Sequence, residues 1–232
     1  MSKIRPIAKG RDQKALGTVI AIGNQKGGVG KSTNCVHLAA ALGEKGYRVL
    51  IIDLDPTAGS TKLLGIDTQG FAGTLELLTG EEKLEDVIVN ENLPEGVDLV
   101  TARIDLSNLE AILIKNRFQE KTLILDEPLK AARKIYDVIF LDTPPSPGDI
   151  TTVAAYSSAD WFLLSVFPQP LAILGLSDAI NDIGLVRHKT NKHLEVLGVI
   201  ISAVKRTSKF WQTIEALKAQ ATLEATSLGT KI

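Results

Sequence analysis

A glycine-rich stretch with two lysines has the residue types and spacing of a phosphate-binding loop. Residues 23–33 read GNQKGGVGKST. The glycines permit positive φ, so that successive backbone N–H groups can surround a phosphate. Lys31 is placed to reach the β- and γ-phosphates of a nucleotide, and the Ser32 hydroxyl is a ligand for Mg²⁺. The residues expected around the phosphates are Gly27, Gly28, Val29, Gly30, Lys31, Ser32 and Thr33.

Carboxylates follow two apolar runs of the sequence. Asp53 and Asp55 come after the run VLII, and Asp142 comes after the run VIFL. Ligands bind at the carboxyl ends of the strands in open α/β sheets, so these acids are expected near the phosphate loop. Asp142 is predicted to hold a water of the Mg²⁺ shell. Asp53 is interpreted as a supporting carboxylate that pairs with backbone.

The elements that would position these groups alternate along the chain. Short apolar runs predict strands at 18–23, 48–54, 97–101, 136–142, 160–167 and 194–204. Helical spacing predicts helices at 32–45, 121–134, 149–157, 171–188 and 209–221. In the second of these helices Pro128 is expected near the start or at a break, and glycines are expected to interrupt the fourth.

This alternation predicts the fold class. The strand, glycine loop, helix and strand between residues 18 and 54 form one βαβ unit, which requires a parallel sheet with a right-handed crossover. A phosphate-binding loop also lies between a strand and a helix, so this arrangement favours such a loop over a plain glycine turn. An α/β protein is therefore expected, with a doubly wound, mostly parallel sheet and helices on both faces.

The composition limits the class of protein. Of the 232 residues 44% are hydrophobic and 23% charged, which is typical of a globular domain. A single cysteine, Cys35, excludes a disulfide framework and an iron–sulfur cluster held within one chain. The apolar runs are much shorter than the roughly 20 residues of a membrane span, and the N-terminus lacks the apolar region of a signal peptide. A cytoplasmic protein without membrane contact is expected.

Charge is distributed unevenly although the net charge is −1. Residues 1–17 carry five Lys or Arg against one acid and are expected to form a flexible basic arm, before a single domain at 18–232. Residues 76–98 carry eight acids against one lysine, and residues 187–218 carry seven Lys or Arg against two acids. A solvated face explains each run about as well as a binding surface does. The acidic and basic segments are expected on different parts of the surface, because they would otherwise cancel.

Lys26 gives the phosphate loop its second lysine, and a lysine followed by GGVGKS is the signature of the deviant Walker A class. The stretch resembles the ParA/MinD family of dimerising P-loop ATPases. The resemblance implies ATP and Mg²⁺ as cofactors, with Lys26 reaching across to the nucleotide of a partner subunit and Asp55 orienting the attacking water. Lys26, Lys31 and Asp55 are thus the expected catalytic residues. The TPP sequence at 143–145, after the Walker B residue Asp142, resembles the family's switch loop.

The similarity extends from about Thr18 to Lys209 and has two departures. After Asp55 and Pro56 the family usually continues Gln-Gly-Asn, where this chain has Thr57-Ala58-Gly59. Family members also continue with a segment that lines the nucleotide base and a final helix, and the domain is expected to lack that C-terminal segment or to be truncated. Adenine specificity rests on the resemblance alone.

The resemblance implies a leading hypothesis for function. An ATP-dependent homodimer would bind DNA without sequence preference and position a plasmid, a chromosome or a protein cluster on the nucleoid. A ParB-like or cargo-adaptor protein would stimulate hydrolysis. In chromosomal members an arginine at the position of Arg206 contacts DNA, so Arg206 and its neighbours Lys205 and Lys209 are the expected contacts.

Two alternatives remain open. A MinD-like membrane ATPase needs a C-terminal amphipathic helix, and residues 212–229 offer only modest apolarity. A nucleotide-gated binding module with negligible turnover is the other alternative, and the presence of Lys31, Asp55 and Asp142 argues against it.

Overall fold

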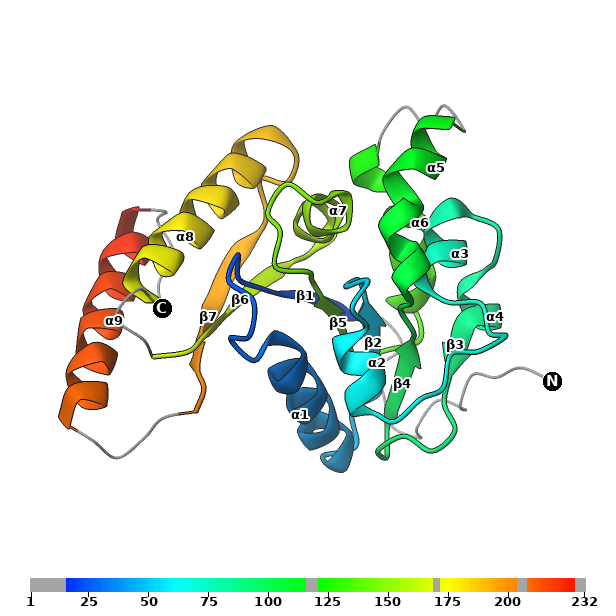
Figure 1. Ribbon diagram of the computed structural model, residues 1–232, viewed down its shortest axis with the longest axis horizontal. Helices are drawn as coiled ribbons and strands as arrows, with labels where there is room; N and C mark the ends of the chain where they lie inside the picture. The colour runs from blue at the N-terminus through cyan, green and yellow to red at the C-terminus, as the bar shows by residue number, and fades with distance from the viewer. Residues whose placement is uncertain (1–15, 116–120, 169–171, 204–207, 228–232) are drawn as a thin grey trace.

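The computed structural model describes residues 16–115, 121–168, 172–203 and 208–227. In this part of the chain a seven-stranded sheet forms the centre of the molecule, in the order β3-β4-β2-β5-β1-β6-β7 (Figure 1). The strands are β1 (Thr18–Gly23), β2 (Val49–Asp53), β3 (Ile88–Val89), β4 (Val97–Val100), β5 (Val138–Asp142), β6 (Trp161–Val166) and β7 (Glu195–Ile201). Only β3 is antiparallel to its neighbour among these strands. The predicted α/β class with a mostly parallel sheet is confirmed.

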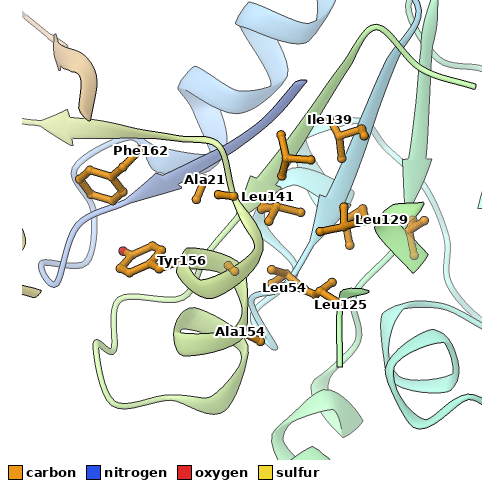
Figure 2. Packing of buried hydrophobic residues seen from close by; sticks show 14 of the residues in the cluster. Ala21, Leu54, Leu125, Leu129, Ile139, Leu141, Ala154, Tyr156 and Phe162 are labelled. Atoms are coloured by element: carbon orange, nitrogen blue, oxygen red, sulfur yellow. The ribbon is translucent and has the colours of Figure 1, made fainter. Parts of the chain in front are cut away.

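Helices cover both faces of the sheet (Figure 1). They are α1 (Lys31–Glu44), α2 (Gly59–Leu63), α3 (Thr74–Thr79), α4 (Leu84–Val87), α5 (Leu109–Lys115), α6 (Asp126–Ala132), α7 (Ile150–Ser158), α8 (Ala172–Lys189) and α9 (Ser208–Ser227), with 3₁₀ turns η1 (Ile104–Asn108) and η2 (Lys121–Leu123). On one face, buried Cys35 and Ala39 of α1 pack on β2, β4 and β5. The other face packs on α6, α7 and α8, and Figure 2 shows Leu129 and Ala154 in the same buried cluster as Leu141.

Strand register places the predicted acids side by side. β2 pairs with β5 so that Asp53 lies opposite Asp142, at the carboxyl end of both strands. β1 lies on the other side of β5, with Ile22 opposite Asp142. The loop that follows β1 therefore emerges at the same edge of the sheet as the two carboxylates, as the sequence predicts.

The helix expected at 121–134 is shorter than predicted. A 3₁₀ turn comes first, and α6 begins only at Asp126. Pro128 thus lies in the first turn of the helix. The backbone N–H groups of this turn have no acceptor within the helix, so proline, which has no N–H, removes no helical hydrogen bond there.

The helix expected to be interrupted by glycines is continuous. Gly175 and Gly184 both lie inside α8. Each interior glycine costs about 1 kcal/mol relative to alanine, and the burial of Leu176, Ile180 and Ile183 in the core offsets this cost. A Cβ on Gly175 would lie 3.8 Å from Asn24 Oδ1, in ordinary van der Waals contact, so the packing of α8 beside the phosphate loop does not require glycine there.

The acidic and basic segments lie at opposite edges of the sheet, as expected. Residues 76–98 include α4 and β3 and contribute to α3 and β4, whereas residues 187–218 include β7 and contribute to α8 and α9 (Figure 1). The expectation that these charges do not cancel is confirmed for the elements that the structure describes. None of the described helices combines the length and apolarity that a membrane crossing requires.

Candidate nucleotide site

The phosphate loop connects β1 to α1 and uses glycine where its backbone requires it. Gly28 and Gly30 have φ of 73° and 86°, in the left-handed region. Gly27 does not take this conformation, and a Cβ on it would meet no other atom within 4 Å. Gly30 is the N-cap of α1, and no side chain in the described part of the chain caps that helix. The first N–H groups of α1 thus remain available for an anion, which the helix dipole also favours.

A hollow of about 430 Å³ lies over this loop. It is lined by Gly27, Gly28, Gly30, Lys31, Ser32, Thr33, Asp55, Thr57 and Pro145. The structure therefore brings Asp55 and the TPP loop to the predicted phosphate ligands. Val29 does not line the hollow but is buried, and its carbonyl accepts a hydrogen bond from Ser165 Oγ at 2.8 Å.

Lys31 is a buried cation between two carboxylates. Its side chain is almost fully covered. Burial lowers the pKa of the Lys31 ammonium, and the charges of Asp142 and Asp55 partly offset this effect. A cation in a poorly hydrated position interacts strongly with an incoming phosphate, because little water screens the charge.

Asp142 has one oxygen held by protein and one without a partner. Ser60 Oγ donates to Asp142 Oδ2 at 2.7 Å. Oδ1 is buried and has no hydrogen-bond partner among the described residues. Burial raises the pKa of Asp142, while hydrogen bonds from Ser60 and Ser32 and the charge of Lys31 lower it. A buried carboxylate oxygen beside the Ser32 hydroxyl suits Mg²⁺, which prefers oxygen ligands and water.

Asp53 supports the backbone that follows β2. One carboxylate oxygen accepts from Asp55 N at 3.2 Å, and the other accepts from Thr61 N at 2.9 Å and Thr61 Oγ1 at 2.7 Å. Burial and the charge of Asp142 raise the pKa of Asp53 to about 7. This geometry matches the interpretation of Asp53 as a supporting carboxylate, because its acceptors are used within the protein.

Asp55 is held at the hollow by a tight turn. Its Oδ1 accepts from Thr57 N at 2.8 Å and from Thr57 Oγ1 at 2.7 Å. Ala58, which stands where the family usually has glycine, takes a left-handed conformation with φ of 57° and is the N-cap of α2. The turn thus keeps the backbone shape that glycine would favour, at a cost of roughly 1–2 kcal/mol for a residue with a Cβ.

Sequence reasoning missed the polar residues that brace the site. Ser60 and Thr61 of α2 hold Asp142 and Asp53. On the other side of the loop, Asn34 Nδ2 donates to Ser165 Oγ at 2.8 Å and Ser202 Oγ donates to Asn34 Oδ1 at 3.0 Å. Serine, threonine and asparagine at these spacings form no sequence motif, and their partners lie on other elements.

The remaining predicted site residues are not part of this hollow. Lys26 is exposed, and its backbone N–H donates to Asn24 Oδ1 at 2.9 Å. Lys205 and Arg206 lie outside the described residues, as does the side chain of Lys209. The DNA contacts expected at these three positions stay predictions.

We expect Ser60→Ala to weaken Mg²⁺-dependent nucleotide binding by about 10- to 100-fold, the usual loss when a residue that orients a metal-site group is removed. Without the hydroxyl, Asp142 Oδ2 loses its donor and the carboxylate can rotate. The measurement is an Mg²⁺ titration of ATP binding. Ser107→Ala, which removes an exposed hydroxyl bonded to Ile104 O, is the control. The same half-saturating Mg²⁺ concentration in both variants would contradict the role of Ser60.

Comparisons with known proteins identify the family of the chain. Residues 17–196 match a family described as an AAA domain. The chain is 35% identical to the sporulation initiation inhibitor protein Soj of Bacillus subtilis, over 88% of this chain and 79% of that protein. It is also 35% identical to the chromosome partitioning protein ParA of Caulobacter vibrioides, over 84% of this chain and 73% of that protein.

The structural comparison finds the same fold in a protein solved with nucleotide. Cobyrinic acid a,c-diamide synthase from Mycobacterium smegmatis, solved with an ATP analogue and magnesium, matches with a TM-score of 0.81 and 30% identity. The match covers 88% of this chain and 80% of that one. Since the family match and the relatives extend over most of the residues that build the phosphate loop and the carboxylate edge, this chain belongs to the ParA/Soj family of P-loop partition ATPases.

Proposed function

We propose that the protein hydrolyses ATP with magnesium, dimerises when ATP is bound and binds DNA without sequence preference to partition or position cargo. One observation carries the catalytic part: a single hollow unites the phosphate loop, Lys31 and Asp55, with Asp142 beside it. The proposal for dimerisation, DNA and a stimulating partner extends what the relatives' names say of them, namely chromosome partitioning.

The residues of the site would have different roles in ATP hydrolysis. The loop N–H groups and Lys31 would bind the phosphates, and Ser32 with Asp142 would hold Mg²⁺ or its waters. Magnesium supplies positive charge at the phosphate oxygens. Asp55, fixed by Thr57, would orient the attacking water.

Lys26 is proposed to act on the nucleotide of a second subunit. It is exposed and does not line the hollow of its own chain, where Lys31 already supplies a cation. An exposed cation at the rim of a nucleotide site is well placed to meet phosphates that approach with another subunit.

We expect Lys26→Gln to bind ATP normally and to lose either ATP-dependent dimerisation or hydrolysis within the dimer. The charge is removed while the length of the side chain is largely kept. Light scattering with ATP and with ADP, together with hydrolysis rates, makes the measurement. Lys134→Gln changes an exposed lysine far from the loop and is the control. Equal mass and equal activity in the two variants would show that Lys26 is only a surface charge.

DNA binding is proposed for the basic edge of the molecule, which β7 and the ends of α8 and α9 form. Lys and Arg at phosphates position a protein without reading bases, so affinity should be nearly independent of sequence. A dimer doubles the phosphate contacts of a monomer. ATP should therefore tighten DNA binding through dimerisation alone.

We expect Arg206→Ala to weaken binding to all duplexes alike and to make the salt dependence shallower, by about 0.9 in the log–log slope for each phosphate that the variant no longer neutralises. Anisotropy on two unrelated duplexes, with ATP or ADP across a salt series, tests this and the proposed function together. Lys115→Ala, an exposed lysine on α5, is the control. Equal DNA affinity with ATP and with ADP, or unchanged DNA affinity in Arg206→Ala, would contradict DNA as the surface on which the cargo is positioned.

A further inference from the structure

A chain of side-chain hydrogen bonds runs from the end of β7 through α1 and β6 to the phosphate loop. Ser202 Oγ donates to Asn34 Oδ1 at 3.0 Å, and Asn34 Nδ2 donates to Ser165 Oγ at 2.8 Å. Ser165 Oγ then donates to the Val29 carbonyl at 2.8 Å. We propose that this chain sets the orientation of the peptide between Val29 and Gly30 and thereby aims its N–H at the phosphates. Ser165 and Asn34 are then positioning residues for nucleotide binding. The inference rests on the proposed function and specifies what orients its phosphate site.

The direction of the Val29 carbonyl determines the direction of the N–H that follows it. The described residues contain no cis peptide bond, and in a trans peptide the C=O and the N–H point in opposite directions. The Val29 carbonyl points to Ser165, which is fully buried in β6, so the Gly30 N–H points away from that strand. Gly30 lines the hollow over the loop. Its N–H is therefore directed to the place where the phosphates are expected.

The sequence of the loop does not by itself select this orientation. Gly30 has a φ of 86°, and glycine populates positive and negative φ about equally. A flip of the peptide is therefore open to Gly30, and it would turn the Val29 carbonyl toward the hollow. The loop would then present an oxygen to the phosphates in place of an N–H donor. The contact that holds the carbonyl on Ser165 thus decides whether this peptide attracts or repels an anion.

The donors and acceptors give the chain a single direction. A serine hydroxyl has one proton to donate. Because the Asn34 amide donates to the Ser165 oxygen, the Ser165 proton is left for the Val29 carbonyl. Asn34 is itself fixed on two sides, since its Oδ1 accepts from Ser202 and its backbone N–H donates to the Gly30 carbonyl at 2.8 Å. A carboxylate at position 34 would offer no donor, and Ser165 would donate to it instead of to Val29.

Ser165 also holds the beginning of the loop. Its backbone carbonyl accepts from Asn24 Nδ2 at 2.7 Å, and Asn24 Oδ1 accepts from the Lys26 N–H at 2.9 Å. The bonds from Ser165 to Asn24 and to Val29 are both buried, where hydrogen bonds are electrostatically stronger than in water. One residue of β6 thus fixes the loop near both of its ends before nucleotide binds, which lowers the entropy lost on binding.

The test measures ATP affinity and hydrolysis in Ser165→Ala and Asn34→Asp. We expect each change to raise the Kd of ATP by about tenfold or more, as for the loss of one hydrogen bond to a charged group. The kcat at saturating ATP should stay within about twofold of the wild type, because the peptide N–H would bind the phosphates equally in the ground and transition states. Ser157→Ala removes a hydroxyl of α7 that bonds to Thr190 at 2.9 Å and is the control, with the wild-type Kd expected.

A double-mutant cycle separates the hydrogen-bond chain from the charge that Asn34→Asp introduces. In the Ser165→Ala background there is no hydroxyl to divert from Val29, so Asn34→Asp should raise the Kd clearly less than it does in the wild-type background. An equal effect of Asn34→Asp in the two backgrounds would overturn the inference. Denaturant unfolding provides a second readout. A lower free energy of unfolding in Ser165→Ala, with an unchanged Kd of ATP for the folded protein, would show a merely structural role and would also overturn it.

Lys31→Ala, measured beside these variants, distinguishes failure of this inference from failure of the proposed function. Weak ATP binding in Lys31→Ala, together with the wild-type Kd in Ser165→Ala and Asn34→Asp, would overturn this inference alone. Wild-type ATP affinity in Lys31→Ala would overturn the proposed phosphate site and this inference with it.

Discussion

Lys31→Ala is expected to weaken ATP binding by about 100-fold or more. Hydrogen bonds to charged groups contribute up to about 3 kcal/mol each, and Lys31 supplies a buried cation at the phosphate end of the hollow. Its removal also leaves Asp142 and Asp55 without the ammonium that offsets their charge. Equilibrium titration with a fluorescent ATP analogue measures the effect.

The control for this change is Lys45→Ala. Lys45 is the exposed C-cap of α1, the helix that begins with Lys31. It tests whether loss of any lysine on that helix weakens binding. Unchanged ATP affinity in Lys31→Ala would contradict the assignment of the phosphate site itself, and with it the proposed roles of Asp55 and Asp142.

Asp55→Ala is expected to lower single-turnover hydrolysis by about 100-fold or more, while ATP still binds and the dimer persists. The carboxylate should act on the attacking water and not on the ground-state phosphates. Rapid-quench hydrolysis measures the rate, and light scattering with ATP measures the dimer.

Two further variants separate the possible causes. Asp178→Ala removes an exposed acid on α8 and controls for charge. Thr57→Val removes the hydroxyl that donates to Asp55 Oδ1 and keeps the carboxylate. If Thr57→Val lost as much activity as Asp55→Ala, the carboxylate would serve mainly to hold the turn. Hydrolysis at the wild-type rate in Asp55→Ala would remove it from the mechanism.

The regular part of the fold could be predicted because long periodic segments carry strong signals. The strand at 18–23 is found with the predicted bounds, and the helix predicted at 32–45 differs from α1 by one residue at each end. The carboxylates of β2 and β5 meet because adjacent parallel strands end at one edge. These elements needed only apolar spacing and the glycine loop.

The short elements could not be predicted. α2 to α5 have between four and seven residues, too few for a helical period to stand out, and β3 has only two. These elements form because tertiary contacts hold them: Thr61 of α2 binds Asp53, and Thr74 of α3 donates to the Asp53 carbonyl at 2.7 Å.

The contact between α1 and α2 restricts the order in which substitutions can be accepted. A Cβ on Gly59 would lie 2.3 Å from Ser32 Oγ. Asparagine, usual in the family at this position, would collide with the proposed Mg²⁺ ligand, whereas glycine at position 58 fits the left-handed backbone that Ala58 already has. On an evolutionary path between the two sequences, position 58 can therefore change alone. Position 59 can change only after the backbone of α2 has moved away from the phosphate loop.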